Sequence, residues 1–142
     1  MKKVLFVFCG LVMFVLLYAQ ERTGKSVQRI LMSKTWHFGD NRDIGCRFVF
    51  SRDSITYYYV GLYGYDDFGG KRAYYLSNKK DNFFDDSKVG KSKEGTYLIE
   101  KSSISSGLEC SRIVDINDDQ VELEVMGILG GEKKNLIYNA VK

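Results

Sequence analysis

The feature that most constrains the fold is a segment in which apolar and polar side chains alternate on both sides of a short polar turn. It reads IGCRFVF–SRDS–ITYYY and spans residues 44–59. Successive side chains of a strand point to opposite faces, and residues paired across a hairpin share a face. A turn at Arg52 and Asp53 gathers one apolar face, made of Cys46, Phe48, Phe50, Ile55, Tyr57 and Tyr59. The other face carries Arg47, so we expect the apolar face to point inward.

Two further hairpins share a strand expected at residues 121–129. Their turns fall at Asp118-Asp119 and at Gly130-Gly131, and the latter is a strong two-residue hairpin signal. The predicted pairs are Ile116 with Val121, Val114 with Leu123, Val125 with Leu136, Leu123 with Tyr138, and Val121 with Ala140. Both hairpins place Glu122 and Glu124 in water. A shift of one residue would bury these glutamates, so the inward face is well specified.

The rest of the chain continues the same pattern of short strands. The segments TWHF, RAYYLS and GTYLIE bring the number to about eight, in up-and-down order and without an internal repeat. Eight antiparallel strands can close a barrel that holds one small ligand, and closure removes exposed strand edges. The sequence therefore predicts an all-β, up-and-down antiparallel β-barrel. A two-sheet sandwich is the alternative, but it needs crossing connections that these hairpins do not call for.

The amino terminus has the composition of a targeting segment. Lys2 and Lys3 precede an apolar run over 4–17, which is shorter than the roughly 20 residues of a membrane-spanning helix and is followed by Ala19. We expect a signal peptide at 1–19, cleaved after Ala19, with a retained anchor as the alternative. Residues 20–33 would form a leader with a short helix, and residues 34–142 the barrel domain. The expected location is secreted or periplasmic, with no stable membrane insertion after cleavage.

The charge balance excludes one class of partner. Loss of residues 1–19 removes Lys2 and Lys3, so the formal net charge falls from +3 to +1. Nucleic-acid binding proteins carry strongly basic patches. A nearly neutral chain therefore predicts no nucleic-acid partner.

Two cysteines remain after the signal peptide, Cys46 and Cys110. An exported protein meets oxidising conditions, so an even number suggests a disulfide between them. Alternation predicts that both side chains point inward, and closing the loop between them would stabilise the fold by about 4 kcal/mol. The alternative is a pair of buried free thiols.

Specific segments resemble a known family. The early segment Leu31-Met32-Ser33-Lys34-Thr35-Trp36 is similar to the L-x-G-x-W motif of lipocalin-like proteins, with Lys34 where the family has glycine. The segment Tyr74–Glu100 and a late NLIY strand also resemble short exported bacterial members of the calycin superfamily. The resemblance implies an eight-stranded barrel that binds a small apolar molecule in its cup.

Inward parity gives a candidate ligand-binding set. Tyrosine supplies apolar area together with a hydroxyl that needs a partner when buried. The set is Phe48, Phe50, Tyr57, Tyr59, Arg112, Val114, Leu123, Val125, Leu136 and Tyr138. Arg112 could hold a ligand carboxylate through a bidentate pair, or it could lie at the barrel end with its head in water. A core filled by its own side chains is the alternative to a hollow one.

Catalytic and metal-binding patterns have little support. The run Asp115-x-Asn117-x-Asp119 resembles the start of a calcium loop, but Gln120 stands at its sixth position and Met126 at its twelfth. With a single histidine and no G-x-S-x-G or P-loop motif, the sequence predicts neither an enzyme nor a cofactor or metal site.

The sequence leaves two functions open. The first is an exported lipocalin-like protein that binds a small hydrophobic ligand inside the barrel. The second is an envelope protein-interaction module or inhibitor with a solid core, which would bind a protein partner through the loops Tyr63–Lys71 and Asp81–Gly95. Those loops would expose an aromatic patch of Phe68, Phe83 and Phe84.

Overall fold

The computed structural model describes residues 25–41, 44–60, 66–102, 107–125 and 132–142. The expected signal peptide and the expected turn at Gly130-Gly131 lie outside these ranges. Within them, none of the helices has the length and apolar character needed to span a membrane.

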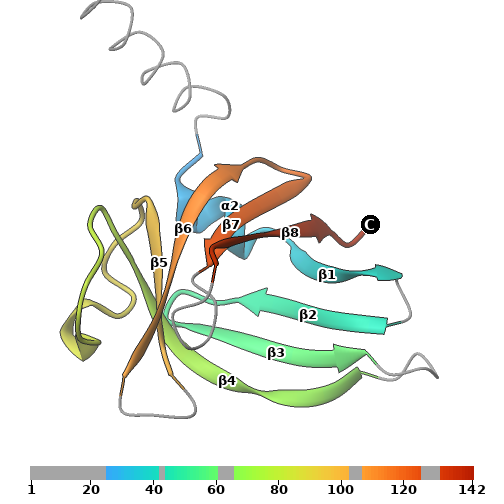
Figure 1. Ribbon diagram of the computed structural model, residues 1–142, viewed down its shortest axis with the longest axis horizontal. Helices are drawn as coiled ribbons and strands as arrows, with labels where there is room; N and C mark the ends of the chain where they lie inside the picture. Colours follow the sequence, from blue (N-terminus) through green and yellow to red (C-terminus); the bar gives the residue numbers. More distant parts are fainter. Residues whose placement is uncertain (1–24, 42–43, 61–65, 103–106, 126–131) are drawn as a thin grey trace, which may run out of the picture.

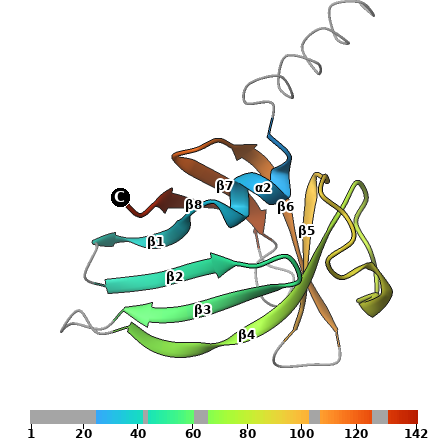
Figure 2. The same ribbon diagram turned by 180° about the vertical axis from the view of Figure 1, so that it is seen from behind.

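Eight antiparallel strands form a closed barrel in simple sequence order (Figures 1 and 2). They are β1 (Thr35–Asn41), β2 (Ile44–Phe50), β3 (Ser54–Val60), β4 (Asp66–Ser77), β5 (Tyr97–Lys101), β6 (Leu108–Ile116), β7 (Gln120–Val125) and β8 (Lys134–Ala140). The first and last strands close the ring, because Trp36 pairs with Ala140 and His37 with Asn139. The predicted all-β up-and-down barrel is thus confirmed.

The hairpin of β2 and β3 has the predicted register throughout. Phe50 lies opposite Ile55, and the other pairs follow in step along both strands. The turn is short and internally bonded, since the backbone N–H of Ser51 donates to the carbonyl oxygen of Ser54 at 2.8 Å. With no extra residue in either strand, face alternation alone fixes which side chains point inward.

A β-bulge changes the face of half of strand β6. Ile113 pairs with Leu123 while Asp115 pairs with Glu122, so Val114 is the extra residue. A bulge reverses the alternation on one side of itself. Arg112 and Val114 were predicted to point inward, and this is wrong: both are exposed on the outer face.

A second bulge lies where β4 pairs with β3. Tyr57 pairs with Gly70 and Tyr58 with Phe68, which leaves Gly69 as the extra residue. A Cβ on Gly69 would lie 2.6 Å from the ring of Tyr59, so a larger residue there would require that ring to move. Phe68 therefore belongs to strand β4, where its ring packs edge-on against Tyr58 with centroids 6.3 Å apart.

The hairpin of β7 and β8 has the predicted inward face but a different register. Leu123 pairs with Leu136 and Val121 with Tyr138, a slip of two residues from the predicted pairing. A two-residue slip keeps every side chain on its face. Glu122 accordingly lies outside the barrel, where its Oε1 accepts a hydrogen bond from the side-chain amide of Asn135 at 2.7 Å.

Helix α2 (Val27–Met32) closes the end of the barrel where β1 begins (Figures 1 and 2). The side chain of Ser26 caps it by accepting from the backbone N–H of Arg29. The indole Nε1 of Trp36 donates to the carbonyl oxygen of Leu31 at 2.8 Å, and this bond ties the helix to the barrel. Around it lies a buried apolar cluster, which we term the floor: Ile30, Leu31, Trp36, Ile55, Leu76, Leu98 and Val121.

The connection between β4 and β5, residues 78–96, covers the outer wall of these two strands (Figure 1). It contains the 3-10 helix η1 (Asp86–Lys88). Tyr75 points outward and is buried beneath the connection, where its ring lies 5.2 Å from Phe84 and its hydroxyl donates to Asp81 at 2.9 Å. Phe84 is therefore half-buried and does not join an exposed aromatic patch, whereas Phe83 is fully exposed.

Cys46 and Cys110 are free thiols in the structure, so the predicted disulfide is not present. Cys46 lies on β2 and Cys110 on β6, which are four strands apart in either direction around the ring. A disulfide needs Cα atoms within about 7 Å, and opposite walls of a barrel are farther apart than that. The bulge in β6 also turns Cys110 to the outer face, where it pairs with the outward-facing Ile99.

Candidate functional site: the barrel cavity

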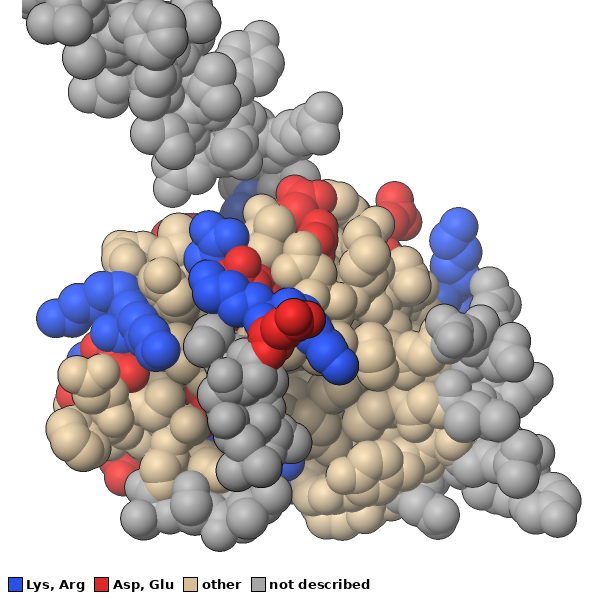
Figure 3. All heavy atoms as spheres, viewed as in Figure 1, with Lys and Arg blue, Asp and Glu red and all other residues tan. Residues whose placement is uncertain are grey.

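A cavity of about 370 Å³ occupies the interior of the barrel above the floor. In Figure 3 the face drawn in Figure 1 is hollowed near its centre, beside the residues shown in grey; charged side chains of both signs lie along the upper edge of the hollow, and uncharged surface lies to its right. Of the predicted ligand-binding set, the cavity is lined by Phe48, Phe50, Tyr57, Tyr59, Leu123, Val125, Leu136 and Tyr138. Arg112 and Val114 do not line the cavity, because the bulge in β6 places their side chains on the outer face of the barrel.

Aromatic rings form much of the cavity wall. Phe48 packs edge-on against Tyr57 on one side and Tyr138 on the other, with centroids 5.0 and 4.9 Å apart. Such perpendicular contacts hold the rings in fixed orientations and add to their apolar burial. Tyr59 is 56% exposed and marks the open end of the cavity, opposite the floor.

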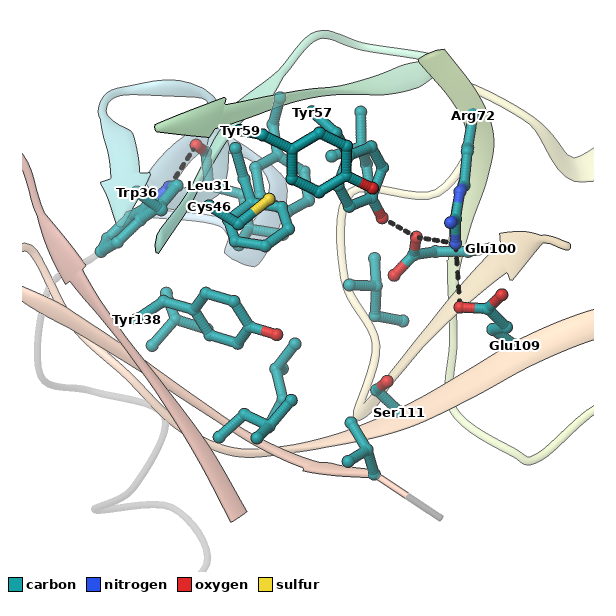
Figure 4. Close-up of a pocket in the computed structure, with 18 residues that line it drawn as sticks. Leu31, Trp36, Cys46, Tyr57, Tyr59, Arg72, Glu100, Glu109, Ser111 and Tyr138 are labelled. Atoms are coloured by element: carbon teal, nitrogen blue, oxygen red, sulfur yellow. Dashed lines mark hydrogen bonds and ion pairs between the residues drawn. The ribbon is translucent and has the colours of Figure 1, made fainter. Parts of the chain in front are cut away.

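One side of the cavity is polar, and we term these four residues the polar patch: Tyr57, Arg72, Glu100 and Glu109. The hydroxyl of Tyr57 donates to Oε2 of Glu100. The Nη1 of Arg72 lies 2.9 Å from Oε2 of Glu109 and 4.0 Å from Oε2 of Glu100. Figure 4 shows this chain of contacts along one wall, with the hydroxyl of Tyr138 across the cavity.

Burial sets the electrostatics of the polar patch. It raises the pKa of Glu100 to about 7, and the negative charge of Glu109 adds to this, while the Tyr57 hydrogen bond and Arg72 oppose it. The pKa of the Tyr57 hydroxyl is raised well above its usual value, first by burial and then by the Glu100 carboxylate. Tyr57 is therefore a permanent hydrogen-bond donor, and Glu100 changes its charge near neutral pH.

Arg72, Glu100 and Glu109 line the cavity but were not predicted from the sequence. Strands β4 and β5 were recognised, but their faces were not compared across the long connection between them. Face alternation contains the signal, because Arg72 shares a face with Leu76 on β4, and Glu100 shares a face with Leu98 on β5. The inward arginine of this barrel is thus Arg72 and not Arg112.

Cys46 adds a thiol to the cavity wall, in agreement with its predicted inward parity. Burial raises its pKa, so the thiol is protonated at neutral pH and acts as part of the apolar lining. Among the described residues, no three His, Cys, Asp or Glu side chains are grouped so that they could hold a metal ion.

No known protein family, curated protein or solved structure matches this chain significantly. The cavity geometry and the residues that form it are accordingly the basis for the function proposed below.

Proposed function

We propose that this protein is an exported, lipocalin-like carrier or sensor that binds a small, mainly apolar molecule inside its barrel. The observation that supports this is the cavity itself: about 370 Å³ of space above a packed floor, open at the end marked by Tyr59. Ligand pockets typically range from roughly 300 to 1,000 Å³ and are lined mostly by apolar and aromatic side chains. A closed eight-stranded antiparallel barrel is compatible with a lipocalin-like fold.

The size of the cavity limits the ligand. At about 370 Å³ it lies near the lower end of the ligand-pocket range, which suits a molecule of one or two rings or a short aliphatic chain. The apolar lower part favours a hydrophobic body, and the polar patch favours a single polar group on that body.

Binding can be tested with N-phenyl-1-naphthylamine, an uncharged probe whose fluorescence rises in apolar surroundings. The purified protein should bind it at one site, and Ser111→Phe should abolish binding, because Ser111 is buried and its side chain lines the cavity. Val114→Phe is the matched control, since it adds the same ring to the exposed face of the same strand. Equal probe binding by both variants would show that the probe does not enter the barrel.

Mass spectrometry of an organic extract of the purified protein then identifies the natural ligand. A stoichiometric small molecule that is absent from extracts of Ser111→Phe supports the proposal. The protein-interaction alternative has its own observation, the exposed side chains of Phe68 and Phe83. It would be favoured by a protein that takes up no probe and captures a partner that is lost with Phe83→Ala.

A further inference from the structure

The polar patch holds two carboxylates and a single cation. Arg72 is shared between Glu109 and Glu100, and its guanidinium also lies over the Tyr57 ring, 4.8 Å from the centroid. One guanidinium cannot neutralise two ionised carboxylates. The patch therefore carries a net negative charge whenever both glutamates are ionised. A second cation in the cavity would neutralise that charge.

One carboxylate oxygen of Glu100 faces the cavity and is free to accept a hydrogen bond from a ligand. Its Oε2 accepts from Tyr57, whereas its Oε1 makes no hydrogen bond to any of the residues that the structure describes. The residue is only 8% exposed, and Figure 4 shows its carboxyl group on the cavity wall. This Oε1 oxygen is not one of the fully buried atoms without a partner, so it is open to the cavity, where a ligand that donates a hydrogen bond can pair with it.

The surrounding rings suit a cation as well. Tyr59 and Tyr138 line the same cavity, and Tyr138 lies across it from the patch. The faces of aromatic rings attract cations, most strongly where water is excluded. A cationic group would therefore gain from the rings and from the carboxylate together.

We propose that the cavity selects small molecules with a protonated amine on an apolar body, and that the amine donates to Oε1 of Glu100. This inference rests on the proposed function and specifies its ligand class. An anionic ligand is disfavoured, because Arg72 is already engaged by Glu109 and the anion would meet two carboxylates. A neutral ligand of the same shape binds with intermediate affinity.

The proposal includes a pH dependence. The groups that face Glu100 are Tyr57 from β3, Arg72 from β4, Glu109 from β6 and Tyr138 from β8. Because the pKa of Glu100 is about 7, an amine that binds below that pH must displace a proton. Affinity for an amine thus rises with pH until Glu100 is fully ionised, by at most tenfold per pH unit.

Three naphthalene probes of matched shape test the selection: 1-naphthylmethylamine, 1-naphthalenemethanol and 1-naphthoic acid. Their affinities are measured at pH 8 by displacement of N-phenyl-1-naphthylamine from the purified protein. We expect the amine to bind at least tenfold more tightly than the alcohol, and the acid to bind most weakly. Between pH 8 and pH 5.5 the amine should lose at least tenfold in affinity, while the alcohol changes less than twofold.

Glu100→Gln keeps the shape of the side chain and removes its charge. It should bring the amine within threefold of the alcohol and leave the affinity for the alcohol within twofold of the wild type. Glu124→Gln is the control, because Glu124 pairs with Arg112 and Lys133 on the outer face. It should leave all three affinities unchanged.

The outcomes separate the two proposals. Equal affinities of amine and alcohol in the wild type, or an amine preference that survives Glu100→Gln, would overturn the amine selection and leave the binding function standing. A protein that binds none of the probes would overturn both. If Glu100→Gln fails to fold, as judged by circular dichroism, the probe series and its pH dependence in the wild type decide the question.

Discussion

The two ends of the barrel interior have opposite chemistry. The floor is built from side chains such as Leu31, Trp36 and Val121 that are at most 2% exposed, and it has one side-chain hydrogen bond, from Trp36 to Leu31. The polar patch lies nearer the open end, where Arg72 keeps 23% of its side chain exposed and Glu109 keeps 47%. The comparison separates a tightly packed apolar layer from a layer of interacting ionisable side chains within the same barrel.

The floor and the polar patch differ in how their burial affects the stability of the fold. The floor side chains are almost completely removed from water, so apolar packing contributes nearly its full free energy there. The polar patch has ionisable groups held in a partly dry cavity, which costs stability and is tolerated where the groups interact with one another or with a ligand. Changes at the floor should therefore affect folding, and changes at the patch should affect binding and its pH dependence.

The largest expected effect is at the floor. Trp36→Ala removes a buried ring and its hydrogen bond to Leu31, and large-to-small changes of this kind cost about 3–5 kcal/mol. Urea denaturation should show that loss in the free energy of unfolding. Phe83→Ala is the control, because the ring of Phe83 is 84% exposed and its removal should cost no more than about 0.5 kcal/mol. Equal losses in the two variants would contradict the description of the floor.

The polar patch should reveal itself in the pH dependence of stability. The pKa of Glu100 rises from 4.5 to about 7 on folding, so the folded state is favoured when this carboxyl is protonated. Its contribution is fully present below pH 4.5 and is lost as the pH rises to about 7, by about 3 kcal/mol. Relative to the wild type, Glu100→Gln should therefore gain stability between pH 4.5 and pH 7.5.

Urea denaturation of both proteins at several pH values measures that gain. The exposed carboxylates with lowered pKa values, such as Asp53 and Asp118, have the opposite pH dependence but are the same in both proteins. Their contributions cancel in the difference. A difference between the two proteins that does not change with pH would place Glu100 in water and not in the patch.

A smaller effect is expected where the helix meets the barrel. The side-chain amide of Gln28 donates to the carbonyl oxygen of Arg52 at 3.0 Å, and Gln28 is buried. Gln28→Ala leaves that carbonyl unpaired and should cost about 1 kcal/mol. The unfolding transition should shift by that amount while probe binding in the cavity is retained. Loss of binding without loss of stability would mean that Gln28 acts in the site itself and not in the attachment of the helix.

The smallest effect is expected for Arg112→Ala. Arg112 lies on the outer face, half-exposed, and its Nη2 is 3.3 Å from Oε2 of Glu124. Exposed ion pairs contribute about 0–1 kcal/mol. The variant should keep both its stability, within that range, and its affinity for 1-naphthoic acid. A marked loss of affinity for this anion would restore the inward placement that the sequence suggested.

The β2–β3 hairpin shows what sequence reasoning can reach. Its turn is short and neither strand contains an extra residue where they pair, so alternation predicted the cross-strand pairs from Phe50–Ile55 to Cys46–Tyr59. In β7–β8 the inward face was predicted and the register was not, because its turn could not be located to better than two residues.

Strand β6 shows where the same reasoning fails. Nothing in LECSRIVDI distinguishes a regular strand from one with a bulge at Val114, since both Ile113 and Val114 suit an interior. The choice is made by the partner strand, where Leu123 packs on Ile113. One extra residue was enough to misplace Arg112 and Cys110, whereas the predicted disulfide fails because Cys46 and Cys110 lie on opposite walls of the barrel.

The polar patch was missed for a different reason. Its residues come from β3, β4, β5 and β6, so it exists only once the barrel has closed. Local alternation gives the face of Arg72 or Glu100 within its own strand. It does not give the register in which β4 and β5 pair after the connection 78–96, and that register decides whether the two side chains come into contact.

The central claim, that the barrel is hollow above its floor, is tested most directly by diffraction from a crystal under xenon pressure. Xenon enters apolar cavities without needing a specific polar contact. We predict xenon, together with ordered water beside Glu100, in the space bounded by Leu123, Leu136 and Tyr138. An interior in which these three side chains meet and leave room for neither xenon nor water would contradict the claim.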